Sequence, residues 1–201
     1  MNKNLHKVLS ISRWTKNLFS FKVKRPLNFK FKSGEFVMIG LYDNNQKPIL
    51  RAYSICSPNW SEELEFYSII VKNGPLTSKL KNIEKNDEII LMTKSTGTLI
   101  LDAIKSGRRL FLFSTGTGFA PFASLIRDPE TYEKFDKIIL THTCRDINEL
   151  SYSSQIISEC KTDNLIREFS QNKLIHYQTT TRDKSPYKGR ITERITNNSF
   201  Y

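Results

Sequence analysis

The order of apolar and polar positions changes character about half-way along the chain. Up to residue 101, short runs rich in β-branched and aromatic residues nearly alternate with polar residues, and turn-forming residues separate the runs. Regularly spaced short strands of this kind indicate a small antiparallel β-barrel. The predicted strands are residues 8–13, 18–23, 35–41, 51–56, 64–71, 88–93 and 98–101.

One segment of this half reads as a short helix instead. In Gly74-Pro-Leu-Thr-Ser-Lys-Leu-Lys-Asn82, Pro75 is tolerated in a first helical turn, and the hydroxyls of Thr77 and Ser78 lie near the N–H groups of that turn. A helix start here serves either as a plug over one barrel end or as an anion site, and the two interpretations are compatible.

From residue 107 on, apolar runs alternate with helical spacing. We predict strands at residues 110–113, 137–142 and 174–179, followed by helices from about Pro121, over 152–168, and from 191. Such alternation predicts a parallel sheet with helices on both faces. The boundary falls near residues 102–107. The expected fold is therefore an antiparallel β-barrel domain at residues 1–103 and an incomplete α/β parallel-sheet domain at residues 104–201.

A glycine turn, Ser114-Thr-Gly-Thr-Gly118, lies between the first predicted parallel strand and its helix. A strand–turn–helix of this kind directs backbone N–H groups and the positive end of a helix at one place, which suits a phosphate. Gly116 and Gly118 let the backbone approach a ligand closely. Alternatively, the glycines only make the turn tight, and their spacing differs from the common G-x-G-x-x-G pattern.

Composition narrows the class of protein. The chain has 201 residues, of which 38% are apolar, and no long apolar span, so we expect a globular protein without stable membrane association. The net charge of +11 is spread along the chain without a basic helix or aromatic nucleic-acid motif, so we expect no nucleic-acid partner. The start of the chain has no apolar signal core, which favours the cytoplasm. We also expect a monomer.

Cysteine and histidine give no sign of a metal or a disulfide framework. Cys56, Cys144 and Cys160 lack paired spacing, and the three histidines are dispersed. We therefore expect buried thiols and no structural metal.

A second cluster lies in the predicted barrel. Alternation in Arg51-Ala-Tyr-Ser54 places Arg51 and Tyr53 on one face of a strand. Arginine suits a pyrophosphate because its planar fork makes two charge-assisted bonds, and tyrosine can stack on a flat ring. By itself, this quartet is equally typical of an ordinary exposed strand face.

Taken together, an ordered set of motifs resembles the bacterial ferredoxin/flavodoxin–NADP reductases, from about Val8 to the end of the chain. The resemblance implies an FAD-dependent enzyme that transfers electrons between NADPH and ferredoxin or flavodoxin, by hydride transfer to the flavin. The positive charge suits docking of such a small acidic protein. The motifs are Arg51-Ala-Tyr-Ser54, Leu64-Glu-Phe-Tyr67, Gly74-Pro-Leu-Thr-Ser78, Thr96-Gly-Thr98 and Ser114-Thr-Gly-Thr-Gly118 with Ala120-Pro-Phe122.

The resemblance also implies an FAD site on the barrel. Arg51 would hold the pyrophosphate, Tyr53 would pack against the isoalloxazine, and Ser54 would lie near the flavin atom that accepts hydride. Tyr53 and Ser54 are therefore the expected catalytic residues. The other expected FAD contacts are Ala52, the backbone of Ser68, Ile69 and Ile70, and the phosphate-binding segment Pro75, Leu76 and Thr77.

By the same resemblance, the glycine turn would face NADP(H), with Thr117 also near the flavin, and a few arginines would mark the adenosine 2′-phosphate. Arg145 and Arg182 follow predicted strands, at the edge where open α/β sheets bind ligands. A dianionic phosphate needs such cations, which favours NADP over NAD, although Asp146 and Asp183 could instead hold these arginines in ion pairs. The expected contacts are Thr115, Gly116, Thr117, Gly118, Cys144, Arg145, Thr181, Arg182 and Arg190.

The family pattern continues with two further strands, a Cys-Gly-x-Pro segment and a tail over the flavin, which are absent up to Tyr201. The chain is then either a fragment of a longer protein or a truncated descendant, and the alternative function is an FAD-binding protein without productive NADPH chemistry. Another rival is an oxygenase reductase on the same plan, which normally carries an iron–sulfur domain with four cysteines.

Overall fold

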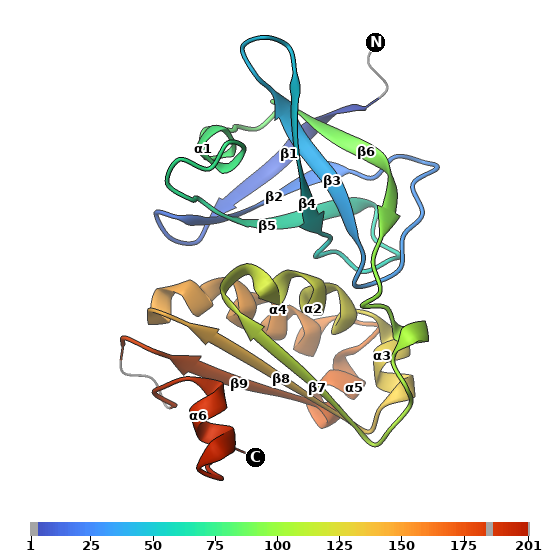
Figure 1. The fold of residues 1–201 in the computed structure, drawn as a ribbon. Coiled ribbons are helices and arrows are strands. Elements are labelled where there is room, and N and C mark those ends of the chain that lie inside the picture. Colours follow the sequence, from blue (N-terminus) through green and yellow to red (C-terminus); the bar gives the residue numbers. More distant parts are fainter. Residues whose placement is uncertain (1–3, 184–186, 201) are drawn as a thin grey trace. The chain divides into compact units, whose positions relative to one another are not determined.

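The structure is a computed structural model that describes residues 4–183 and 187–200. The chain divides into two compact units, Met1–Ile104 and Lys105–Tyr201, and each unit has its own sheet (Figure 1). Within the described residues, no helix is both long and apolar enough to cross a membrane.

The first unit is the predicted antiparallel barrel. Its sheet has the order β4-β3-β6-β1-β2-β5, and every pair is antiparallel. An isolated antiparallel bridge between Ile55 and Phe66 joins the two ends of this order, so the sheet closes on itself. The strands are β1 (Leu5–Arg13), β2 (Leu18–Lys24), β3 (Phe36–Tyr42), β4 (Pro48–Ser54), β5 (Glu63–Ile69) and β6 (Glu88–Thr96).

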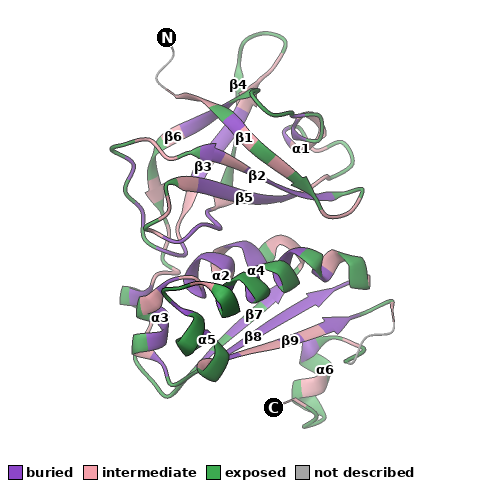
Figure 2. Ribbon diagram, turned by 180° about the vertical axis from the view of Figure 1, so that it is seen from behind, coloured by how far each residue is buried: buried purple, intermediate pink, exposed green. Residues whose placement is uncertain are grey.

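Apolar side chains fill the barrel interior. The rings of Phe21 and Phe66 lie 5.5 Å apart there, and both residues are fully buried. Leu80 of the short helix α1 (Thr77–Leu80) and its N-cap residue Leu76 belong to the same core, which agrees with the plug interpretation of this helix. Figure 2 shows this burial along β2 and β5.

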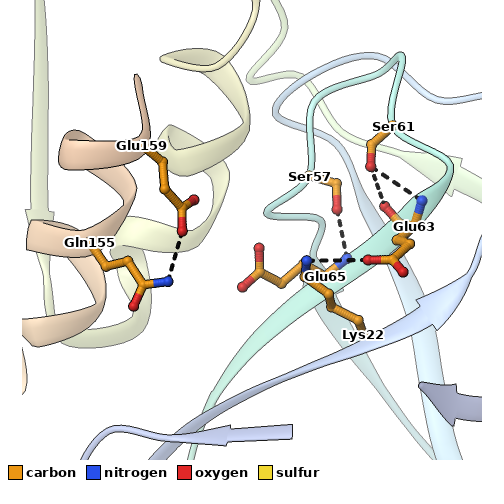
Figure 3. A network of polar contacts seen from close by, with 7 residues as sticks. All are labelled: Lys22, Ser57, Ser61, Glu63, Glu65, Gln155 and Glu159. Carbon is orange, nitrogen blue, oxygen red and sulfur yellow. Dashed lines mark hydrogen bonds and ion pairs between the residues drawn. The ribbon is translucent and has the colours of Figure 1, made fainter. Parts of the chain in front are cut away.

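A small polar network fixes the start of β5 (Figure 3). The backbone N–H of Glu65 donates to the Ser57 hydroxyl at 2.7 Å, and the Ser61 hydroxyl both donates to and accepts from the Glu63 backbone. Lys22 on β2 forms an ion pair with Glu63 at 3.2 Å, but both side chains are exposed, so the pair adds little stability. The same figure shows an i, i+4 bond in the second unit, from Gln155 to Glu159 at 2.7 Å.

The strand predicted at residues 98–101 is wrong. β6 ends at Thr96, Gly97 has a φ of 146°, and a 3-10 turn, η1 (Leu101–Ala103), follows. A left-handed glycine breaks the extended backbone, so the apolar residues after it cannot continue as a strand.

The second unit is the predicted parallel α/β sheet. Its strands are β7 (Arg109–Thr115), β8 (Lys137–Cys144) and β9 (Leu174–Thr180), in the order β7-β8-β9. Figure 1 shows α2 and α4 on one side of this sheet and α6 on the other. The helices are α2 (Ala120–Leu125), α3 (Pro129–Lys134), α4 (Ser151–Thr162), α5 (Arg167–Lys173) and α6 (Ile191–Thr196), with the 3-10 turns η2 (Gly116–Phe119) and η3 (Ile147–Leu150).

One predicted helix is two helices in the structure. The helix predicted at residues 152–168 is in fact α4 and α5, because Asp163 is extended and its carboxylate accepts from the Leu165 N–H at 2.8 Å. A side chain that bonds the nearby backbone competes with the helix. Consistently, Leu165 is 57% exposed, whereas Ile156 and Cys160 on α4 are buried.

Helix α3 was not predicted. It has six residues, too few to show a helical period, but its start carries the usual signals. The Asp128 carboxylate caps it by accepting from the Glu130 N–H at 3.1 Å, and Pro129 occupies the first position.

Candidate functional site

Strands β4 and β5 bring two of the predicted barrel residues together. The hydroxyls of Tyr53 and Ser68 form a hydrogen bond of 2.9 Å, and the Tyr53 ring packs edge-on against Phe66 with centroids 6.4 Å apart. Burial raises the pKa of the Tyr53 phenol, and the bond to Ser68 lowers it by less. The phenol therefore stays protonated at neutral pH, with one edge packed on the core and the ring half-buried.

Arg51 lies two residues before Tyr53 on β4 and is exposed. Its guanidinium donates to the Leu50 carbonyl at 2.7 Å, and it has no ion pair with a carboxylate in the described part of the chain. Ala52 is exposed and Ser54 is half-buried. This part of β4 thus offers an unneutralised cation beside an aromatic ring, which suits a phosphate attached to a flat ring system.

The segment between β5 and α1 closes on itself. The Thr77 hydroxyl accepts from the Val71 N–H at 3.2 Å, so it braces this loop, and α1 has no side-chain N-cap. The backbone N–H groups of Leu76 and Thr77 have no acceptor among the described residues. Two free donors at this place agree with the predicted phosphate contacts. Pro75 is exposed, and Ile69 and Ile70 are half-buried.

In the second unit, the glycine turn follows β7 directly. Gly116 has a φ of 49°, a conformation that favours glycine, so the tight-turn interpretation accounts for this residue. It does not account for Gly118, whose φ is not in that region. A Cβ built at either glycine meets no atom within 4 Å, so open space lies in front of both. The exposed Thr115 and Gly118 border that space.

A residue that sequence reasoning missed supports this turn from inside. His142 on β8 is fully buried, and its Nε2 lies 2.9 Å from the Gly116 carbonyl oxygen. Its Nδ1 lies 2.8 Å from the Ser153 hydroxyl, and its ring stacks on Phe119 with centroids 5.0 Å apart. Burial lowers the pKa of His142 to about 4, with the Gly116 bond acting in the opposite direction, so the ring is neutral at pH 7. The sequence shows only one of three scattered histidines here.

The predicted residues at the ends of β8 and β9 lie together. The Thr181 N–H donates to the Cys144 carbonyl at 3.0 Å, and the Arg182 N–H donates to the Arg145 carbonyl at 2.9 Å. Arg145 and Arg182 are exposed. The Asp183 carboxylate accepts from the Ile147 N–H at 3.0 Å, and neither arginine is ion-paired within the described residues. Two neighbouring cations at this edge are therefore available to an anion.

Cys144 turns its side chain inward. Its sulfur lies 3.2 Å from Nε2 of His142, and the residue is 4% exposed. Burial, followed by the charge of Glu149, raises the pKa of this thiol to about 12. The thiol is thus neutral, and the residue takes part in the sheet edge through its backbone.

Arg190 lies near the same edge, because the residue before it bonds β9. The Gly189 N–H donates to the Thr180 carbonyl at 2.8 Å, and Arg190 follows as an exposed residue immediately before α6. The second unit therefore gathers its predicted site residues around the carboxyl ends of its parallel strands, where open α/β sheets bind ligands.

Known proteins resemble this chain along its whole length. Residues 3–99 match the oxidoreductase FAD-binding domain family. The chain is 53% identical over 194 residues to a flavodoxin/ferredoxin–NADP reductase of Rhodobacter capsulatus, covering 96% of this chain and 72% of the relative. It is 44% identical over 200 residues to a ferredoxin–NADP reductase of Azotobacter vinelandii, covering all of this chain and 77% of the relative.

A solved structure agrees with these sequence relatives. A ferredoxin–NADP⁺ reductase of Neisseria gonorrhoeae, determined with bound FAD and NADP, superimposes with a TM-score of 0.86 at 28% identity. The match covers 97% of this chain and 76% of the Neisseria chain. Both the antiparallel barrel and the parallel α/β sheet expected from the sequence are thereby confirmed.

Proposed function

Because the chain belongs to the flavodoxin/ferredoxin–NADP reductase family, we propose that it is an FAD-dependent oxidoreductase that transfers electrons between NADPH and ferredoxin or flavodoxin. The observation that carries the proposal is the pairing of the unneutralised Arg51 with the half-buried Tyr53 on a barrel of the FAD-binding family. We assign FAD to the first unit and NADP(H) to the second.

The barrel residues fit FAD by their chemistry. Arg51 supplies the forked cation for the pyrophosphate, and the free N–H groups of Leu76 and Thr77 supply further donors. Tyr53, held through Ser68 and Phe66, offers a ring edge and face to the isoalloxazine, with Ala52 and Ser54 beside it. The backbone of Ser68, Ile69 and Ile70 and the exposed Pro75 complete this proposed site.

Bound flavin supplies the chemistry, because it can take two electrons as hydride and return them singly. The chain's own residues then have to bind and orient. The Tyr53 phenol is protonated at neutral pH and held by Ser68, so we assign it a packing role and no role as a base. Ser54 is the polar side chain that we place next to the hydride-accepting atom.

In the second unit, we assign Thr115, Gly116, Thr117 and Gly118 to the phosphate-bearing part of NADP(H). The open space before both glycines supports this assignment. Arg145 and Arg182 together offer two cations for a dianionic 2′-phosphate, with Arg190 beyond β9 and the backbone of Cys144 and Thr181 at the same edge. Their freedom from ion pairs in the described part of the chain favours NADPH over NADH.

The positive charge of the chain supports an acidic protein partner. A net charge of +11 attracts a small acidic ferredoxin or flavodoxin at long range and speeds its encounter. We further propose that the protein works as a monomer in the cytoplasm.

Anaerobic spectroscopy on the purified chain tests the proposal. The chain is loaded with FAD, freed of unbound flavin, and titrated with NADPH and then with NADH. We expect a yellow protein that NADPH bleaches at lower concentration than NADH, and that regains its colour when oxidised flavodoxin is added. A yellow protein that neither nucleotide bleaches would instead support the alternative of an FAD-binding protein without NADPH chemistry.

A further inference from the structure

The buried imidazole of His142 has no role in the proposed function, yet it contacts the glycine turn directly. His142 lies in the central strand β8 and is fully buried. Its two ring nitrogens have separate partners: Nε2 is 2.9 Å from the carbonyl oxygen of Gly116, and Nδ1 is 2.8 Å from the hydroxyl of Ser153 on α4. The ring thus bridges the turn and the helical layer.

The chemistry of these partners fixes the tautomer. A carbonyl oxygen can only accept, so Nε2 must carry the proton. In the neutral ring, Nδ1 then accepts the proton of the Ser153 hydroxyl, whose other possible acceptor is the Leu150 carbonyl at 3.0 Å. The Cys144 sulfur, 3.2 Å from Nε2, belongs to a neutral thiol and competes only weakly.

The bond to Gly116 also determines where the next N–H group points. In a trans peptide, the carbonyl of one residue and the N–H of the following residue point in opposite directions. The Gly116 carbonyl points inward to a fully buried ring, so the Thr117 N–H points away from that ring, and Thr117 itself is partly exposed. Gly116, with a φ of 49°, has the backbone freedom to adopt other peptide orientations if that bond is lost.

We propose that His142 is a positioning residue for the nucleotide site: through Gly116 it holds the Gly116–Thr117 peptide plane with the Thr117 N–H directed outward to a phosphate of NADPH. This inference rests on the proposed function. Ser153 sets the tautomer, and Phe119 limits rotation of the ring by stacking on it. His142 touches neither nucleotide nor flavin in this role, so its effect falls on binding rather than on the chemical step.

A pair of amide substitutions isolates the Gly116 bond. The amide of His142→Asn can occupy the place of Nδ1 and keep Ser153, but it is too short for Gly116, whereas the longer His142→Gln can put its amide nitrogen near Nε2. We expect the KM for NADPH to rise about tenfold in His142→Asn, because that variant loses one good hydrogen bond. Its kcat should stay within about twofold of wild type. His142→Gln should stay within about threefold of the wild-type KM.

His176→Asn is the matched control, because His176 is a half-buried histidine on β9 whose ring has no hydrogen bond to the turn in the described residues. It should leave the KM for NADPH unchanged. Equal KM values for the Asn and Gln variants at position 142, or an equal rise in the His176 variant, would overturn the proposal. FAD affinity, measured by flavin fluorescence, should be the same in all four proteins, because the barrel is untouched.

Ring ¹⁵N NMR of the wild-type chain tests the inference without activity. We expect the Nε2–H tautomer for His142 at pH 7, and an Nδ1–H tautomer would refute the bond to Gly116 whatever the kinetics show. The two possible failures are distinguishable. If NADPH does not bleach the wild type, the proposed function fails, while bleaching together with an unchanged KM in His142→Asn rejects only the role of His142.

Discussion

The two units of this chain support their candidate sites with different kinds of side chain. Beneath Tyr53, the barrel buries Phe66 and Phe21 in an apolar core. Beneath the carboxyl ends of β7, β8 and β9, the second unit buries polar groups that bond one another. There, His142 joins Gly116 to Ser153, and the hydroxyls of Thr143 and Thr179 lie 2.6 Å apart.

This difference has consequences for how each site can fail. In the barrel, the proposed ligand contacts lie over a mainly apolar core, in which the Tyr53 hydroxyl bonds the buried Ser68, so we expect that binding and folding can be changed separately. In the second unit, the turn is held by buried hydrogen bonds, and a buried polar group that loses its partner destabilises the fold. We therefore expect site and stability to be coupled there, and the coupling to depend on pH.

The largest effect should follow from a cavity in the apolar core. Phe66→Ala removes a fully buried ring that packs against Phe21 and Tyr53, and we expect a loss of about 3–5 kcal/mol in the free energy of unfolding. Urea denaturation followed by circular dichroism measures it. The control Phe169→Ala, at a ring that is 41% exposed on α5, should lose less than half as much. Comparable losses of unfolding free energy in the two variants would mean that the apolar core is not the main source of the barrel's stability.

Acid should act chiefly on the second unit. The pKa of His142 is lowered to about 4, and that of His176 to about 3, in both cases mainly by burial. Below pH 6.5 the unfolded chain binds protons that these folded residues reject, so stability falls as the pH drops and levels off below the folded pKa values. For His142 alone, the loss between pH 7 and pH 4 is about 3 kcal/mol.

Urea denaturation at several pH values checks this prediction. The variant His142→Gln, which has no titrating ring, should show a shallower fall in the free energy of unfolding between pH 6.5 and 4. A fall as steep as in the wild type would place the acid sensitivity elsewhere.

In the barrel, loss of the exposed cation should weaken ligand binding without loss of fold. We expect Arg51→Ala to raise the Kd for FAD by about tenfold to a hundredfold, because hydrogen bonds to charged groups contribute about 1.5–3 kcal/mol. The apoprotein should unfold at the same urea concentration as wild type, since the one bond of Arg51 within residues 4–183 and 187–200 goes to the neighbouring Leu50 carbonyl. Arg51→Lys keeps the charge and loses the fork, so its Kd should be intermediate.

The arginines of the second unit should act on the other nucleotide. Arg182→Ala should raise the KM for NADPH about tenfold and leave the KM for NADH nearly unchanged, because only NADPH carries the 2′-phosphate. Arg167→Ala, at an exposed position on α5, serves as the control with the same charge change. Equal effects on NADPH and NADH would remove Arg182 from the proposed phosphate site.

Sequence patterns predicted the barrel and the order of strands and helices well, because alternation and apolar runs reflect burial directly. They failed where a local feature outweighs the pattern. The Asp163 carboxylate bonds the Leu165 N–H and ends α4, and the positive φ of Gly97 ends β6. In the candidate sites, Arg51 and Tyr53 were proposed because their types suit the ligand, and the other contacts because of the family resemblance, and all of these assignments stay predictions.

His142 could not be predicted, because its importance lies in which strand lies beside the glycine turn, and that is a property of the sheet order β7-β8-β9. The free N–H groups of Leu76 and Thr77 were foreseeable only in part. The hydroxyl that the sequence places near them is bonded to Val71 instead, which the pattern of residues does not show.

The smallest effect we predict concerns the hydrogen bond between Tyr53 and Ser68 beneath the barrel site. Tyr53→Phe keeps the ring against Phe66 but removes the hydroxyl that bonds Ser68, so the free energy of unfolding should fall by about 1 kcal/mol. The Kd for FAD should change by less than about threefold, because stacking needs the ring and not the hydroxyl. Tyr53→Ala, which removes the ring as well, should weaken FAD binding far more than it weakens the apoprotein. If Tyr53→Phe instead lost FAD as completely as Tyr53→Ala does, the barrel site would depend on its buried polar bond as the second unit does, and the contrast between the two units would not hold.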